Sequence, residues 1–117
     1  MMKFNVKIFA ALVLVLMLNV CAYAESLPSV TMLSTKTCPA CEQMSRVLKD
    51  IDAQYSGKIS TSHIYLEDNP DIAEHYKVRY VPTLLFRDVS GRLVAQEVGY
   101  RSLEGVLAVF RRAGIDI

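Results

Sequence analysis

Ser34–Met44 reads STKTCPACEQM, and this stretch decides the fold. It holds two cysteines, Cys38 and Cys41, with Pro39 directly after the first. Such a pair can be a structural disulfide, half of a metal site, or a redox pair. A disulfide across two intervening residues closes a very short loop, so it stabilises a fold little through loop-closure entropy. The reactivity of the two thiols is therefore the better explanation of their spacing.

The residues that follow Cys38 are predicted to form an amphipathic helix, because apolar residues recur every three or four positions as far as Tyr55. Pro39 suits the first helical position, where a missing N–H costs nothing. Cys38 is then the N-cap, where the helix dipole favours a thiolate, and Lys36 lies nearby with a positive charge. Cys41 lies one turn further along on the apolar face, where burial disfavours its thiolate. Cys38 is thus the candidate nucleophile and Cys41 the candidate resolving thiol.

The rest of the sequence predicts an α/β fold with the order β-α-β-α-β-β-α. The first β-α-β unit should join parallel strands by a right-handed crossover, and the last two strands should form a hairpin. The result is a four-stranded mixed sheet flanked by helices. Strands are expected at residues 29–34, 58–66, 83–88 and 92–98, and helices at 39–55, 70–76 (capped by Asn69) and from 103 onward (capped by Ser102).

The N-terminus has the three-part layout of a secretory signal peptide. Two lysines occur in the first seven residues, and Phe9–Val20 is apolar except for Asn19. The motif AYA then ends at Ala24. Cleavage after Ala24 would separate a signal peptide, residues 1–24, from a domain of 93 residues, 25–117. That length is enough for one hydrophobic core.

Two alternatives to cleavage stay open. An uncleaved membrane anchor through residues 8–24 would be short, because a spanning helix needs about 20 apolar residues. Lipid attachment at Cys21 is the second alternative, although Val20 stands where a small residue is usual. Without residues 1–24 the chain has 11 basic and 12 acidic residues and no basic stripe, so no nucleic-acid partner is expected.

The order of elements together with the C-x-x-C motif resembles the thioredoxin family over nearly all of the mature chain. Three stretches carry the likeness: DAQYSGKI at 52–59, EDNPDIAEHYKV at 67–78, and YVPTLLF at 80–86. The combination of C-x-x-C with V-P-T about forty residues later is specific. The resemblance implies a minimal thioredoxin-like fold, without the strand and helix that open thioredoxin itself.

The resemblance also implies the site and the activity. The protein would be a thiol–disulfide oxidoreductase that needs no cofactor beyond the Cys38–Cys41 pair and no metal. The Val81–Pro82 bond would be cis, and substrate chains would bind along Tyr80 and Val81, with Gly99 in a second wall.

Two departures concern proton transfer. Met32 stands where thioredoxin buries an acid, and His63 stands where it has a lysine. His63 would then either transfer protons or be a half-buried strand histidine without a role.

The leading interpretation is an exported, periplasmic and monomeric protein that exchanges disulfides with protein thiols. The absence of the inserted helical domain of the larger disulfide-forming oxidants favours a reductant, which would need a membrane redox partner for recycling. Two other classes stay open. One is copper handling on the cysteine thiolates, with His63 and His75 as further candidate ligands. The other is a binding module that keeps the fold without turnover.

Overall fold

The computed structural model describes residues 5–20 and 26–117. The predicted cleavage site at Ala24 and the candidate lipid site at Cys21 lie outside the described residues. The elements, in chain order, are α1 (Val6–Val20), β1 (Ser29–Ser34), α2 (Pro39–Gln54), β2 (Ser60–Tyr65), α3 (Pro70–His75), β3 (Thr83–Arg87), β4 (Leu93–Val98) and α4 (Leu103–Arg112).

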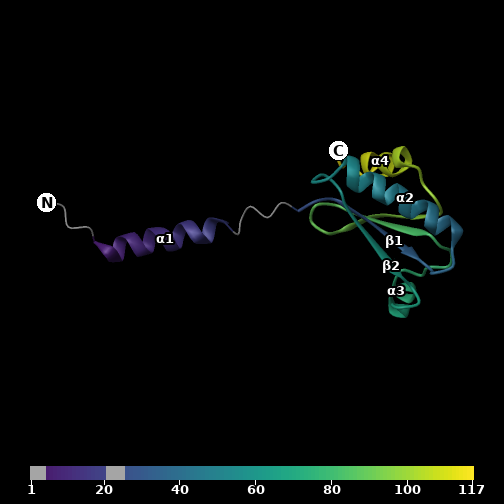
Figure 1. Ribbon diagram of the computed structural model, residues 1–117, viewed down its shortest axis with the longest axis horizontal. Helices are drawn as coiled ribbons and strands as arrows, with labels where there is room; N and C mark the ends of the chain where they lie inside the picture. Colours follow the sequence, from purple (N-terminus) through teal and green to yellow (C-terminus); the bar gives the residue numbers. More distant parts are fainter. Residues whose placement is uncertain (1–4, 21–25) are drawn as a thin grey trace.

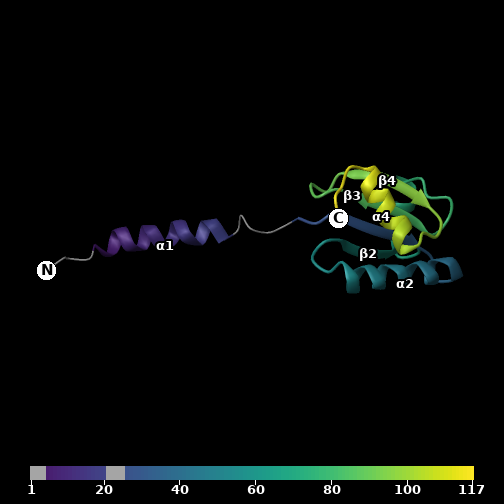
Figure 2. The ribbon, with the colours of Figure 1, turned by 90° about the horizontal axis from the view of Figure 1, so that it is seen from above.

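The four strands form one mixed sheet in the order β2-β1-β3-β4. Strand β1 pairs parallel with β2 and antiparallel with β3, and β3 pairs antiparallel with β4. Helices α2 and α4 lie side by side on one face, and α3 lies on the other (Figures 1 and 2). This is the four-stranded α/β thioredoxin-like architecture that the sequence predicted.

The hydrophobic core lies between the sheet and the pair α2 and α4. Helix α2 buries one face through residues spaced three or four apart, from Cys41 to Ile51. Strands β1 and β3 contribute fully buried side chains, among them Met32 and Phe86. The ring of Phe86 meets that of Phe110 edge to face, with centroids 5.1 Å apart. Burying large apolar side chains in this way supplies the main driving force of folding.

Every predicted boundary lies within two residues of the observed one, and two local details at the end of α2 and the start of α3 are of interest. Helix α2 ends at Gln54, and the amides of Lys58 and Ile59 turn back to the carbonyl of Tyr55 before β2 begins. Asn69 is at the N-cap position of α3, but its side chain forms no capping bond. It donates instead to the carbonyl of Tyr65 at 3.1 Å, so the expected side-chain cap is wrong.

Helix α1 is a separate apolar segment. It contributes no described residue to the core beneath α2 and α4, and its described side chains are exposed. No helix among the described residues is both long enough and apolar enough to span a membrane.

Candidate active site

The sheet register brings the sequence-predicted site residues to one edge of the domain. Strand β1 ends at Ser34, just before the cysteine pair, and its residue Leu33 pairs with Thr83 at the start of β3. Thr83 in turn pairs with Val98 at the end of β4. The segment before Thr83 and the turn after Val98 therefore lie at the same edge as the cysteines.

Cys38 and Cys41 form a disulfide, with their Cα atoms 5.2 Å apart. Cys38 is the N-cap of α2, and its sulfur accepts a hydrogen bond from the backbone N–H of Cys41 at 3.1 Å. Cys38 is partly exposed, whereas Cys41 is only 3% exposed and belongs to the core. The two sulfurs thus differ in access to a partner, as expected for a nucleophile and a resolving thiol.

A hydrogen bond connects the segment before β3 to the turn after β4, at the edge of the domain that carries the cysteines. The Val81–Pro82 peptide bond is cis. The N–H of Gly99 donates to the carbonyl of Pro82 at 2.8 Å, and the hydroxyl of Thr83 donates to the carbonyl of Tyr80 at 2.6 Å. The side chain of Tyr80 is 71% exposed, so it lies on the open surface.

A small cavity of about 70 Å³ lies against the disulfide. Both cysteines line it, together with Ser34 and His63. The hydroxyl of Ser34 is hydrogen-bonded to Nε2 of His63, and the ring of His63 lies against that of Tyr65. His63 is exposed rather than half-buried, but desolvation of its ring still lowers its pKa below the usual 6.5. The lowered pKa favours a neutral imidazole at pH 7, which can accept a proton.

Met32 occupies the position next to His63 in the sheet register and is fully buried. No carboxylate is therefore available at that position. Sequence reasoning missed Ser34, which it treated only as the last residue of a strand. A signal was available: Ser34 lies two residues after Met32, so it shares the face of the sheet on which α2 lies.

Lys36 lines the cavity at the disulfide together with Cys38, but its charge already has a partner. Its ammonium group forms an ion pair with Asp68 at 3.1 Å, and its backbone N–H donates to the carboxylate of Glu67. The hydrogen bond to Asp68 raises the pKa of Lys36. The N-terminus of α2 is therefore the main feature of the described site that favours a Cys38 thiolate.

The four candidate metal ligands do not come together. His75 is at the end of α3, across the sheet from the cysteines, whereas His63 shares their cavity. Within residues 5–20 and 26–117, no group of three or more His, Cys, Asp or Glu side chains is placed to hold a metal ion.

Comparisons with known proteins agree with this geometry. A family described as "Thioredoxin-like domain" matches residues 21–114. The chain belongs to the thioredoxin-like family.

Among curated members, thioredoxin of Buchnera aphidicola is 34% identical over 62 residues, which are 53% of this chain and 56% of that protein. Thioredoxin of Staphylococcus aureus is 33% identical over 73 residues, covering 62% of this chain and 68% of that protein. The matched region thus spans little more than half of the Buchnera thioredoxin. These relatives and the Cys38–Cys41 disulfide indicate thiol–disulfide oxidoreductase chemistry.

Solved structures show the same thioredoxin-like fold. A chloroplastic thioredoxin z superposes with a TM-score of 0.69 at 14% identity, covering 84% of this chain and 88% of that one. A malarial protein superposes with a TM-score of 0.68 at 20% identity, covering 74% of this chain and 97% of that one.

Proposed function

We propose that this thioredoxin-like protein is an exported thiol–disulfide oxidoreductase that reduces disulfides in protein substrates. The observation that carries the proposal is the disulfide at the start of α2, with Cys38 partly exposed and Cys41 buried in the core. In thiol–disulfide exchange, the attacking thiolate must be accessible, and the resolving thiol needs only to reach the first sulfur.

The reaction has two exchange steps. In the reduced protein, the Cys38 thiolate attacks one sulfur of a substrate disulfide, and the other substrate sulfur leaves as a thiolate. Cys41 then loses its proton and attacks the Cys38 sulfur, which breaks the mixed disulfide and releases the second substrate thiolate. Two electrons have passed to the substrate, and the protein is left with the Cys38–Cys41 disulfide seen in the structure.

We assign the proton from Cys41 to His63, acting through the hydroxyl of Ser34. Three observations support this role: both residues line the cavity at the disulfide, they are hydrogen-bonded to each other, and the pKa of His63 is lowered. A neutral imidazole that is hydrogen-bonded to a hydroxyl in the same cavity can serve as a general base.

The substrate chain would bind between the segment before β3 and the turn after β4. Tyr80 supplies an exposed aromatic surface, and the hydrogen bond from Gly99 to Pro82 holds the two walls together. The backbone of Val81, which is partly exposed, would pair with an extended substrate, as in strand addition. Protein thiols and disulfides are therefore the substrate class.

Export follows from the signal-peptide layout of residues 1–24. A reductant in an exported compartment needs a source of electrons, so we propose a membrane redox partner that reduces the disulfide after each turnover. Disulfides persist in such compartments, which gives a reductant substrates there.

Trapping of mixed disulfides tests this proposal in cells. The full-length Cys41→Ser chain is expressed, exported proteins are quenched with acid and alkylated, and adducts are separated on non-reducing gels. The matched control is the Cys38→Ser, Cys41→Ser double variant. We expect reducible adducts in the exported fraction with Cys41→Ser alone. Equal adducts in both variants, or none in either, would contradict the proposal.

A further inference from the structure

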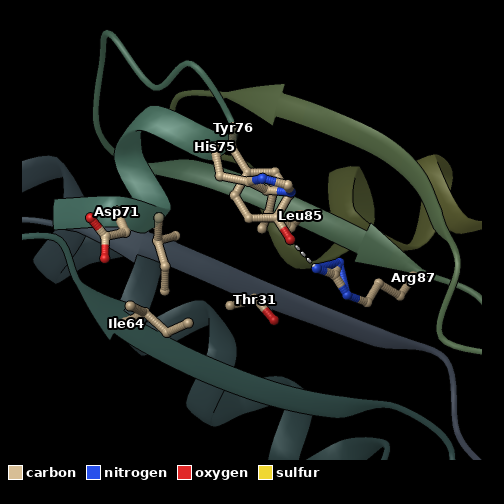
Figure 3. Close-up of a pocket in the computed structure, with 8 residues that line it drawn as sticks. Thr31, Ile64, Asp71, His75, Tyr76, Leu85 and Arg87 are labelled. Atoms are coloured by element: carbon tan, nitrogen blue, oxygen red, sulfur yellow. Dashed lines mark hydrogen bonds between the residues drawn. The ribbon is translucent and has the colours of Figure 1, made fainter. Parts of the chain in front are cut away.

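A second and larger cavity lies on the opposite face of the sheet, beneath α3. Its volume is about 460 Å³, within the range of small-molecule sites. Strand residues Thr31, Ile64 and Leu85 line it from the sheet (Figure 3). Ile72 of α3 also lines it. The cavity exists because α3 has only six residues and does not cover this face completely.

Arg87, at the end of β3, lines one end of this cavity. Its Nη2 donates to the hydroxyl of Tyr76 at 2.5 Å, and its guanidinium lies over the Tyr76 ring, 5.8 Å from the centroid. Its Nη1 is buried. Among the side-chain nitrogen and oxygen atoms buried in the described residues, it alone lacks a hydrogen-bond partner. A buried donor without a partner is costly, and an anionic oxygen that reaches Nη1 on rotation of the guanidinium would satisfy it.

The other charged groups of the cavity are arranged asymmetrically. Asp71 lies at the end of the cavity opposite Arg87, with the strand residues between them (Figure 3). His75 lies next to Tyr76, with ring centroids 4.7 Å apart, so its positive form would add to the attraction of an anion. The carboxylate of Asp71 would repel a second negative charge on the ligand.

We propose that this cavity binds a small organic monoanion, a carboxylate with an apolar body. The carboxylate pairs with the guanidinium of Arg87, and the body lies on Thr31, Ile64 and Leu85. A planar guanidinium matches the two oxygens of a carboxylate, and an apolar floor with one convergent charge is the usual composition of a ligand site. The site is separate from the disulfide, on the other face of the sheet.

Titration of the purified protein with sodium octanoate, followed by amide ¹H–¹⁵N correlation spectra, tests this site. We expect saturable shifts at the amides of Thr31, Ile64, Ile72 and Leu85. Octanol, which has the same body without the charge, should bind at least about ten-fold more weakly, because its hydroxyl replaces a charged acceptor with two oxygens by a neutral one.

Variants of two arginines test whether octanoate binding depends on the charge of Arg87 in particular. Arg87→Gln should weaken octanoate binding by about ten-fold, whereas the control Arg92→Gln, on an exposed hairpin arginine, should leave it unchanged. If Arg87→Gln does not fold, Asp71→Asn decides: removing the negative charge should tighten octanoate binding by about two-fold.

The titrations would overturn the site if they gave no saturable shifts at the four amides, equal binding of octanol and octanoate, weaker binding by Asp71→Asn, or unchanged binding by a folded Arg87→Gln. Shifts of the same amides on dilution without octanoate would also overturn it, because they would show that a second copy of the chain covers this face. No readout here involves the cysteines, so the outcome is independent of the oxidoreductase proposal.

Discussion

The two faces of the sheet differ in how tightly they are packed. The face beneath α2 and α4 holds the core and the cysteine pair, whereas the face beneath α3 has a cavity. Beneath α2 and α4, large apolar side chains such as Phe86 and Phe110 are fully buried, and Cys41 is part of that core. Beneath α3, Thr31 and Ile64 stay partly exposed, and a cavity separates the helix from part of the sheet. A reactive pair held by a close-packed core keeps its geometry through repeated exchange. The loosely covered face has room for a ligand.

The largest effect is expected when the nucleophile is removed. Cys38→Ser should abolish thiol–disulfide exchange, because a hydroxyl cannot form the mixed disulfide. His75→Ala, on the α3 face, should leave the rate of exchange unchanged. The rate of insulin reduction driven by dithiothreitol measures both variants. Loss of activity in a folded His75→Ala protein would show that the chemistry is not confined to the α2 face.

Truncation of one large side chain on each face should reveal the difference in packing. Phe110→Ala removes a fully buried ring and should lower the free energy of unfolding by about 3–5 kcal/mol. Ile72→Ala removes a partly exposed side chain beside the cavity and should cost about 1 kcal/mol. Urea denaturation gives both values. Equal losses would mean that the α3 face is packed as tightly as the other.

His63→Gln should slow exchange by about ten- to a hundred-fold, because the general base for Cys41 is lost. The pKa of His63 is lowered by desolvation, so the wild-type rate should fall as the pH drops below 6.5 through that lowered pKa. The variant should lack this component of the pH–rate profile. Overlapping rates and profiles would leave His63 as a strand histidine without a role in proton transfer.

The lowered pKa of His63 also predicts the direction in which the stability of the protein changes with pH. Below pH 6.5 the unfolded chain binds a proton at His63 more readily than the folded chain does. The free energy of unfolding should therefore decrease as the pH falls through this window, and it should do so less in His63→Gln. Thermal unfolding of the two proteins between pH 7 and 5 compares the slopes.

The smallest effect concerns the helix caps on the two faces. Ser102→Ala removes the hydroxyl that accepts from the Gly105 N–H at 3.1 Å and should cost about 1 kcal/mol. Asn69→Ala, at the start of α3, removes no capping bond and should cost less, because only an exposed hydrogen bond to Tyr65 is lost. Paired urea titrations distinguish the two. A larger loss of unfolding free energy in Asn69→Ala than in Ser102→Ala would contradict this prediction.

Local patterns predicted the α2 face well. The spacing of apolar residues and the proline after Cys38 located α2, its N-cap and its buried face, because these depend on neighbours within four residues. The sequence predicted β1 with its observed bounds, Ser29–Ser34. The resemblance to thioredoxins suggested the roles of Pro82 and Gly99, which no local periodicity indicates.

The pairing of the strands was predicted, but side-chain contacts that depend on their register were not. The hydrogen bond between Ser34 and His63 arises from the parallel pairing of β1 with β2, and sequence alone does not fix that register. Lys36 was placed beside Cys38 by proximity in sequence, but the loop after β2 supplies Asp68 as its partner. The cavity beneath α3 likewise depends on how far a short helix covers the sheet.

The reduction potential of the Cys38–Cys41 couple tests the central claim most directly. The purified protein is equilibrated against graded glutathione and dithiothreitol buffers, and the fraction of dithiol is measured by alkylation. We predict one reversible two-electron transition near the thioredoxin end of the scale, at about −270 mV. A transition near −120 mV would mean that the protein delivers disulfides rather than reducing them. Failure to titrate as a reversible couple would contradict the oxidoreductase itself.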